Sequence, residues 1–369
     1  MTSGRLTVSL WATVAVTAMG SAAWCQQPPI ALSVEVVKRD VVLWEPIFAK
    51  LHVRNTSDEP VRMVPTYEAV RVRSVRDEGP LSEDRRFGGM PTWWQERRRV
   101  ISSSPPARPA WLIGQGEEFV TWMGLLIERE MREPGTYHVT IDYLPSADMV
   151  REPGGIDAEP KLWLGTAESD AGVVVVKEAV GGDKTVAHNV LPWCLWLGWS
   201  YPYVHGDAEH MGDLRSTTYE PYARWYILWS KCLWHVPIPP NPLKGGPGPE
   251  AGYPAAAVRQ FVAEYPDFPL NELADVAIAY GALHQAYADS VREADRLVDE
   301  KKLPWHGSSQ YWRKVWSLWK PRLPEAWATV DAAVAKCQDR AVKDESAYVR
   351  WNFELRLAYQ DKEQEVGTE

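Results

Sequence analysis

The spacing of apolar residues changes from a period of two to a helical period along this 369-residue chain. In stretches such as 32–36, before residue 178, apolar and polar side chains alternate, which is typical of strands with one buried face. Beyond residue 185, in stretches such as 222–233, apolar residues recur three and four positions apart, which is typical of amphipathic helices. The chain is long enough for two domains. The change of period therefore predicts a β-rich domain at 31–178 and an α-helical domain at 185–360, separating at Glu178–Lys184.

The first predicted domain contains several short alternating segments, each bounded by glycine, proline or aspartate. Turn formers are densest at 55–60, between two such segments. The pattern predicts an antiparallel β-sandwich that folds without the helices. The expected strands are Leu32–Val36, Ile47–Arg54, Val61–Val64, Ala69–Val75, Glu118–Ile127, Tyr137–Tyr143 and Val173–Lys177.

Three stretches of this domain resemble bacterial exported immunoglobulin-like domains. They are LWEPIFAKLHVRNTSDEPV at 43–61, EPGTYHVTIDY at 133–143 and WLGTAESDAGVVVVKE at 163–178. The resemblance implies an immunoglobulin-like sandwich but no particular ligand. It departs from the minimal domain at 80–110, which is a long insertion rich in arginine and proline.

The second predicted domain contains helical stripes separated by prolines, with a proline- and glycine-rich loop at 237–254. Helices are expected at 255–265 and 270–289, each with apolar residues on one face. Three more stripes follow towards the C-terminus. They comprise Trp312, Val315, Trp316 and Trp319; Trp327, Val330 and Val334; and Tyr348, Trp351, Leu355 and Tyr359.

About 35 residues of the helical domain are similar to the tetratricopeptide class of bacterial envelope proteins. The similarity rests on Ala257, Phe261 and Tyr265-Pro266, followed by Ala274-Asp275 and Ala279-Tyr280-Gly281. It implies stacked helical hairpins whose groove takes a peptide or protein partner. A second copy at a period near 34 residues is missing from the sequence. A helical bundle without repeats is the alternative.

The N-terminal segment 1–23 has the features of a cleaved secretory signal peptide. Arg5 precedes a short apolar run at 6–19, and small residues follow at 21–23. An uncleaved anchor is the alternative, whereas a lipoprotein signal at Cys25 fits less well because Trp24 is bulky. The expected location is the periplasm, the cell envelope or the exterior, with no transmembrane span in the mature chain. The net charge of −9 argues against a nucleic acid partner.

The four cysteines, at 25, 194, 232 and 337, include no C-x-x-C pair, so a zinc or thioredoxin-like motif has no support. Cys194 and Cys232 both lie in tryptophan-rich apolar segments that are expected to pack together. In an exported protein this favours a Cys194–Cys232 disulfide. The alternative is buried free thiols that pack as small apolar side chains.

The insertion at 80–110 supplies the candidate ligand-binding residues. Paired tryptophans with clustered arginines can stack on and hydrogen-bond to an anionic or sugar ligand. The alternative is a loop that the tryptophans anchor to the sandwich edge. The residues are Trp93, Trp94, Arg97, Arg98 and Arg99.

Histidines and carboxylates, which are common metal ligands, are dense at 205–213. We expect no metal there, because the spacing fits no helix face and Gly206 and Gly212 leave the geometry unfixed. The sequence holds none of the common nucleophile, phosphate-binding, dinucleotide or zinc-helix motifs. It therefore gives no reason to expect a cofactor or a catalytic residue. The weak candidate metal ligands are His205, Asp207, Glu209 and His210, followed by Asp213.

Two architectures associated with binding, without a catalytic motif, predict an exported, non-enzymatic protein–protein interaction module. The alternative is a glycan-binding or glycan-modifying protein, because the chain has 20 tryptophans against 6 phenylalanines and exposed tryptophan stacks on sugars. The helical stripes argue for burial of most of them. A protease-inhibitor role is a third possibility that no residue singles out.

Overall fold

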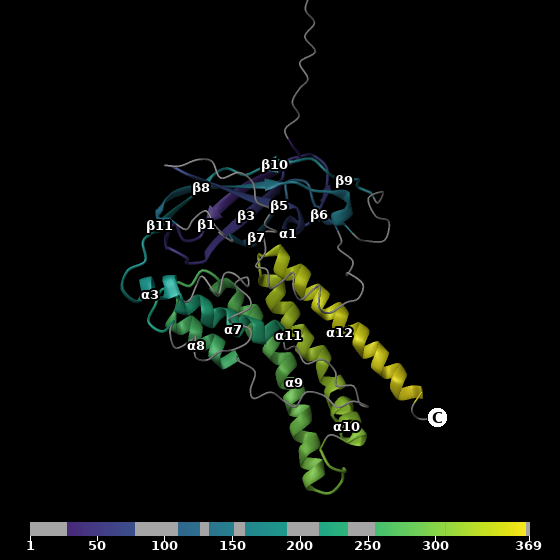
Figure 1. The fold of residues 1–369 in the computed structure, drawn as a ribbon. Helices are drawn as coiled ribbons and strands as arrows, with labels where there is room; N and C mark the ends of the chain where they lie inside the picture. Colours follow the sequence, from purple (N-terminus) through teal and green to yellow (C-terminus); the bar gives the residue numbers. More distant parts are fainter. Residues whose placement is uncertain are drawn as a thin grey trace, which may run out of the picture.

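The computed structural model describes residues 28–77, 110–125, 133–150, 159–189, 214–234, 255–306 and 308–366. Strands occupy the N-terminal half of the chain and helices occupy the C-terminal half (Figure 1). The predicted mixed α+β class and the order of its two parts are confirmed.

The predicted strands are present, and short ones that the sequence did not reveal accompany them. Strands of two or three residues are too short to show an alternation, which explains why they were missed. The strands are β1 (Ile30–Val36), β2 (Asp40–Val42), β3 (Ile47–Asn55), β4 (Val61–Met63), β5 (Val70–Arg76), β6 (Trp111–Ile113), β7 (Glu118–Leu125), β8 (Gly135–Tyr143), β9 (Leu162–Trp163), β10 (Ala167–Glu168) and β11 (Gly172–Lys177).

These strands form three sheets. The first has the order β1-β3-β7 and is antiparallel, with Leu51 of β3 opposite Val34 of β1 and Thr121 of β7. The second has the order β10-β8-β11-β2, with β5 along the other side of β8, and the third has the order β6-β4-β9. Most pairs are antiparallel, as predicted, but β11 pairs with β2 and β4 pairs with β9 in parallel.

The core between the first two sheets follows the alternation of the strands. In β3, the buried residues Ala49, Leu51 and Val53 alternate with partly exposed ones. The two sheets approach closely where β11 crosses β1, because a Cβ atom at Gly172 would lie only 2.7 Å from Cγ2 of Val36. Glycine at 172 is therefore required by close approach of the two sheets.

The helices follow the strands along the chain. They are the short α1 (Thr66–Ala69) within the β-rich half, then α3 (Gly181–Asn189), α7 (Glu220–Trp234), α8 (Ala255–Glu264), α9 (Ala274–Asp299), α10 (Ser309–Trp319), α11 (Leu323–Lys336) and α12 (Arg340–Val366). The 3-10 turns η1 (Ala147–Met149), η3 (Asn271–Leu273) and η4 (Lys320–Arg322) complete the described elements.

Helix α9 is the centre of the helical part, since α7, α8, α10 and α11 all pack against it. Its predicted stripe is buried, and it continues ten residues beyond the predicted end at residue 289. Rings from several helices meet along this stripe. Tyr287 contacts Trp319 of α10 edge-on, and both Trp319 and Trp327 of α11 contact Phe353 of α12.

Helices α10, η4 and α11 run almost continuously beside α9 and return the chain to the sheets (Figure 1). Pro321 and Pro324 lie in the first turns of η4 and α11, where the missing amide hydrogen leaves no helical bond unmade. The chain thus goes out along α9 and comes back along α10 and α11. Its far end is the turn between α9 and α10.

Most described tryptophans in the helices are buried, as the stripes predicted. Trp225, Trp312, Trp316, Trp319 and Trp327 all lie in the core. The prediction for the last helix was wrong at Trp351, which is 51% exposed. Among the side chains of α12 that the structure describes, Ala341, Val342, Val349 and Phe353 are buried. The side chains of Tyr348, Leu355 and Tyr359 lie outside the description, so the rest of this predicted stripe stays a prediction.

Candidate functional site at the sheet–helix junction

The ligand and metal residues predicted from the sequence lie outside the described residues, so their predictions stay predictions. This applies to Trp93, Trp94, Arg97, Arg98 and Arg99, to His205, Asp207, Glu209, His210 and Asp213, and to Cys194. The backbone of Cys232 lies in α7, but its side chain is not described. Within the described ranges, the structure brings no three His, Cys, Asp or Glu side chains into a group that could hold a metal ion.

The most elaborate polar site of the described chain is the junction where the helices meet the first sheet, and Asp339 is its central residue. Asp339 lies between α11 and α12, and its carboxylate caps α12 by accepting from the Ala341 and Val342 amides at 2.8 and 3.4 Å. The other carboxylate oxygen accepts from the Trp122 amide of β7 at 3.2 Å. The Asp339 side chain therefore bonds to the edge strand β7 and also caps the start of helix α12.

The same residue covers an open edge of the first sheet. Strand β7 is at the end of the order β1-β3-β7, and Val120 forms a parallel bridge with Asp339 on the side away from β3. Edge strands present unpaired amides and carbonyls that favour pairing with other chains. The turn between α11 and α12 removes part of that edge from solvent.

Burial raises the pKa of both ionisable groups of this turn. Asp339 is fully enclosed, and desolvation raises its pKa to about 7 even though amide hydrogen bonds and the Thr121 hydroxyl favour the charged form. Burial also raises the pKa of the Cys337 thiol to about 11. A thiol with so high a pKa is a poor nucleophile at neutral pH, so Cys337 has a packing role.

A second contact joins η3 to the sheet. Glu272 accepts from Lys50 Nζ of β3 at 2.5 Å and from the Trp122 indole of β7 at 3.3 Å. The Lys50 ammonium also lies 4.9 Å from the centre of the Trp122 ring, within the range of a cation–π interaction. The ion pair and the ring thus form one cluster on the outer face of β3 and β7.

A third contact joins α7 to the turn between β2 and β3. Tyr222 donates to Glu45 at 2.6 Å, and Tyr219 donates to the Leu43 carbonyl at 2.5 Å. Glu45 is buried and also accepts from Lys38 Nζ at 2.5 Å. Burial, together with the neighbouring Glu45 charge, raises the pKa of the Tyr222 phenol. Tyr222 therefore stays neutral and keeps donating at physiological pH.

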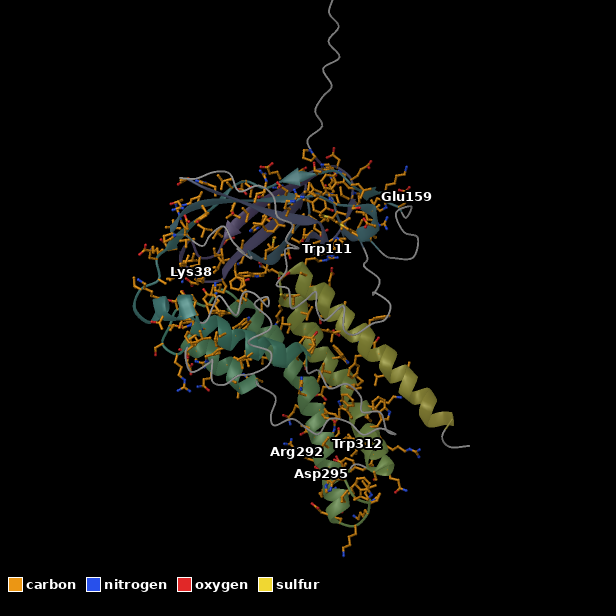
Figure 2. The ribbon with its side chains drawn as sticks, in the orientation of Figure 1. Lys38, Trp111, Glu159, Arg292, Asp295 and Trp312 are labelled. Carbon is orange, nitrogen blue, oxygen red and sulfur yellow. The ribbon has the colours of Figure 1, made fainter. Side chains whose placement is uncertain are left out.

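The start of α12 makes a fourth contact with the sheets. The indole of Trp111 in β6 donates to Asp344, and the Arg340 guanidinium lies 5.9 Å from the centre of the Trp111 ring. Trp111 also packs edge-on against Phe119 of β7 at 4.8 Å between ring centres. In Figure 2, Trp111 lies where the β-rich part meets the start of α12.

Sequence reasoning missed this junction because its partners are far apart along the chain. A signal for Asp339 was available, since an aspartate directly before Arg340 and the apolar Ala341 and Val342 is a helix N-cap pattern. Its contact with Trp122 could not be read from the sequence. The hydrogen bonds described above join the β-rich part to the helical part, and none of these residues is an activated nucleophile.

No family model matches the chain, and no curated protein is significantly similar to it. None of the described helices combines the length and apolar character needed to cross a bilayer.

Proposed function

We propose that this chain is an exported, non-enzymatic binding protein, in which an immunoglobulin-like β part holds a tetratricopeptide-like helical part in a fixed orientation for a protein partner. The observation that supports the proposal is the junction. Three helical segments, namely α7, η3 and the start of α12, contact the sheets through hydrogen bonds of Tyr222, Glu272, Asp339 and Asp344.

A junction of this kind favours one relative orientation, because each buried polar group must keep its partner. A buried donor or acceptor that loses its partner costs about 1–3 kcal/mol. Sliding or rotation of the helices over β3 and β7 would break several such bonds together. The function that gains from this rigidity is presentation of a shaped surface, which lowers the entropic cost of binding a partner.

The chemistry of the junction supports binding more than catalysis. The Cys337 thiol has a raised pKa, and Glu45 and Glu272 are both occupied by hydrogen bonds to donors from other elements. Catalytic groups are commonly poised near neutral pH and face a substrate. Asp339 has a pKa near 7, but the amides of Trp122, Ala341 and Val342 surround its carboxylate.

The test is affinity purification with the full chain as bait from exported and envelope fractions, followed by binding measurements with each recovered protein. The matched control bait is a junction variant, Tyr222→Phe with Glu272→Gln, which removes contacts between the two parts and leaves the surface of α8 to α12 unchanged. We expect a saturable partner whose affinity falls in the junction variant. Recovery of no partner, together with turnover of a small substrate by the same chain, would overturn the proposal.

Glycan binding through Trp93 and Trp94 is the second proposal that the sequence motivates. The structure removes Trp225, Trp312, Trp316, Trp319 and Trp327 as sugar platforms because their rings are buried. Glycan-array binding that is lost in Trp93→Ala or Trp94→Ala, and kept in Trp351→Ala, would favour a glycan over a protein partner.

A further inference from the structure

The segment 301–322, at the turn after α9 and along α10, is rich in positive charge. It contains six lysines and arginines and no aspartate or glutamate. With 49 acidic residues in 369, a stretch of 22 would contain about three (49 × 22/369). The whole chain has a net charge of −9, so this segment is a local cationic region on an acidic protein.

The structure places this segment at the end of the helical hairpin away from the sheets (Figure 1). Lys301, Lys302 and Trp305 are exposed in the turn, and the Trp305 side chain is 70% exposed. In Figure 2, the neighbouring residues Arg292, Asp295 and Trp312 lie towards this end, far from Trp111 at the sheets. The largest exposed aromatic ring of the hairpin is therefore at its tip, beside two cations.

Hydrogen bonds hold the tip in a defined shape. The amides of Lys302 and Leu303 donate to the Leu297 carbonyl at 2.8 and 3.1 Å, and Lys301 has a left-handed φ of 56°. On the other side of the tip, Tyr311 donates to Asp295 at 2.6 Å, and His306 Nε2 lies 3.2 Å from the same carboxylate. Trp305 lies between these two sets of hydrogen bonds, which hold the backbone on either side of it, while its side chain is exposed.

Some cations of this segment are paired with neighbouring acidic residues, and others are not. Lys302 is paired with Glu300 at 2.7 Å, and Arg322 of η4 is paired with Glu293 of α9 at 3.0 Å. In the described part of the chain, Lys301 and Arg313 make no ion pair. Arg313 lies on the exposed side of α10, opposite the buried face that contains Trp312, Val315 and Trp316.

We propose that this end of the hairpin docks on the surface of an anionic lipid bilayer. Lysine and arginine near an anionic membrane are attracted to its headgroups, and tryptophan partitions into the interfacial region. The tip is a protruding end with one apolar ring between cations. A flat lipid surface accepts such a shape, whereas a peptide ligand is usually held in a concave groove. Anionic headgroups would repel the acidic remainder of the molecule, so the end that contains Lys301, Lys302 and Trp305 faces the membrane.

The proposal does not depend on the proposed function, since it concerns a lipid surface and not a protein partner. The test is co-sedimentation of the full chain with phosphatidylcholine vesicles, with and without phosphatidylglycerol. The readout is the ratio of anionic to neutral binding, because any contribution of the apolar residues 6–19 is common to all variants and enters both measurements.

We expect anionic vesicles to bind the chain more strongly and added salt to weaken the binding. Lys301→Gln with Lys302→Gln should lower the anionic-to-neutral ratio by roughly 20- to 30-fold, at about fivefold per lysine. Trp305→Ala should weaken binding to anionic vesicles at both low and high salt. The matched controls, Lys161→Gln with Lys336→Gln and Trp351→Ala, replace exposed residues outside the hairpin tip and should leave the ratio unchanged.

Equal binding of the wild-type chain to neutral and anionic vesicles would overturn the proposal. So would a ratio that falls equally in the tip and control lysine variants. Salt-sensitive retention on an acidic polysaccharide column, with no vesicle binding, would assign the cationic end to a polyanion other than lipid and would also overturn it. Circular dichroism of each variant checks that the exposed substitutions leave the fold intact.

Discussion

Replacement of Asp339 by alanine should destabilise the protein more than the loss of an ordinary helix cap. The substitution removes the acceptor for Ala341 and Val342 at the start of α12 and, in addition, the acceptor for the Trp122 amide in β7. Loss of an N-cap costs about 0.5–2 kcal/mol. A buried donor left without an acceptor costs about 1–3 kcal/mol.

The two contributions sum to about 1.5–5 kcal/mol of unfolding free energy. The variant also no longer buries a carboxylate, which offsets part of the loss. We therefore expect a loss of about 2–3 kcal/mol, measured by urea denaturation followed by circular dichroism. Hydrogen exchange provides a local readout, because the Trp122 amide should exchange faster in the variant.

The matched control is Ser308→Ala. Ser308 caps α10 by accepting from the Tyr311 amide at 3.1 Å, and its cap bond stays within one helix. We expect a loss of about 1 kcal/mol there. If Asp339→Ala costs no more than Ser308→Ala, or leaves the exchange of the Trp122 amide unchanged, then Asp339 is only a helix cap and the junction argument fails.

Three further predictions concern the pH dependence of Asp339, the packing at Gly172 and the stability of the β part alone. Because burial raises the pKa of Asp339 to about 7, the contribution of Asp339 to stability is greatest below its unfolded pKa and falls as the pH rises towards 7. The destabilisation caused by Asp339→Asn, measured by urea titration, should therefore shrink between pH 5 and pH 8. A destabilisation that grows over that interval would contradict the assigned pKa. Gly172→Ala should lower the free energy of unfolding by about 1–3 kcal/mol, because its Cβ would lie 2.7 Å from Val36. Adding Val36→Ala should restore part of this stability. The control Gly182→Ala, whose Cβ meets only Thr217 at 3.9 Å among the described residues, should be neutral. The fragment 24–180 should be less stable than the β part of the whole chain, because Phe48, Trp111 and Trp122 lose their contacts with the helices. If the fragment resists urea as well as the full chain does, the junction does not stabilise the sheets.

The local pattern of the sequence was sufficient for the longer strands and most helices. Alternation in β3 and β8 and the stripe of α9 are properties of neighbouring residues, so they identify both the element and its buried face. In α12 the prediction failed at Trp351, which is exposed. The residues that face the bundle are Val349 and Phe353, and tertiary packing against α11 decides this choice.

The candidate site was beyond sequence reasoning for a different reason. Asp339 and Trp122 are 217 residues apart, and nothing in either segment specifies the other. The same holds for Tyr222 and Glu45, which are 177 residues apart. A polar residue can be recognised as a cap or a turn former from its neighbours, but its second partner depends on how whole elements dock.

The outer face of β3 nevertheless contained a hint of that docking. By alternation, Phe48, Lys50 and His52 share the face that a simple sandwich would expose to water. A large aromatic ring on such a face is unusual unless something covers it. Phe48 stacks on Tyr222 of α7 at 6.0 Å and Lys50 bonds to Glu272 of η3, whereas His52 lies on an exposed part of the sheet beside Glu35 and Glu118. The change from period two to period 3.6 at Glu178–Lys184 thus marks where the secondary structure changes. The outer face of β3, which is covered at Phe48 and Lys50 and exposed at His52, marks where the two parts join.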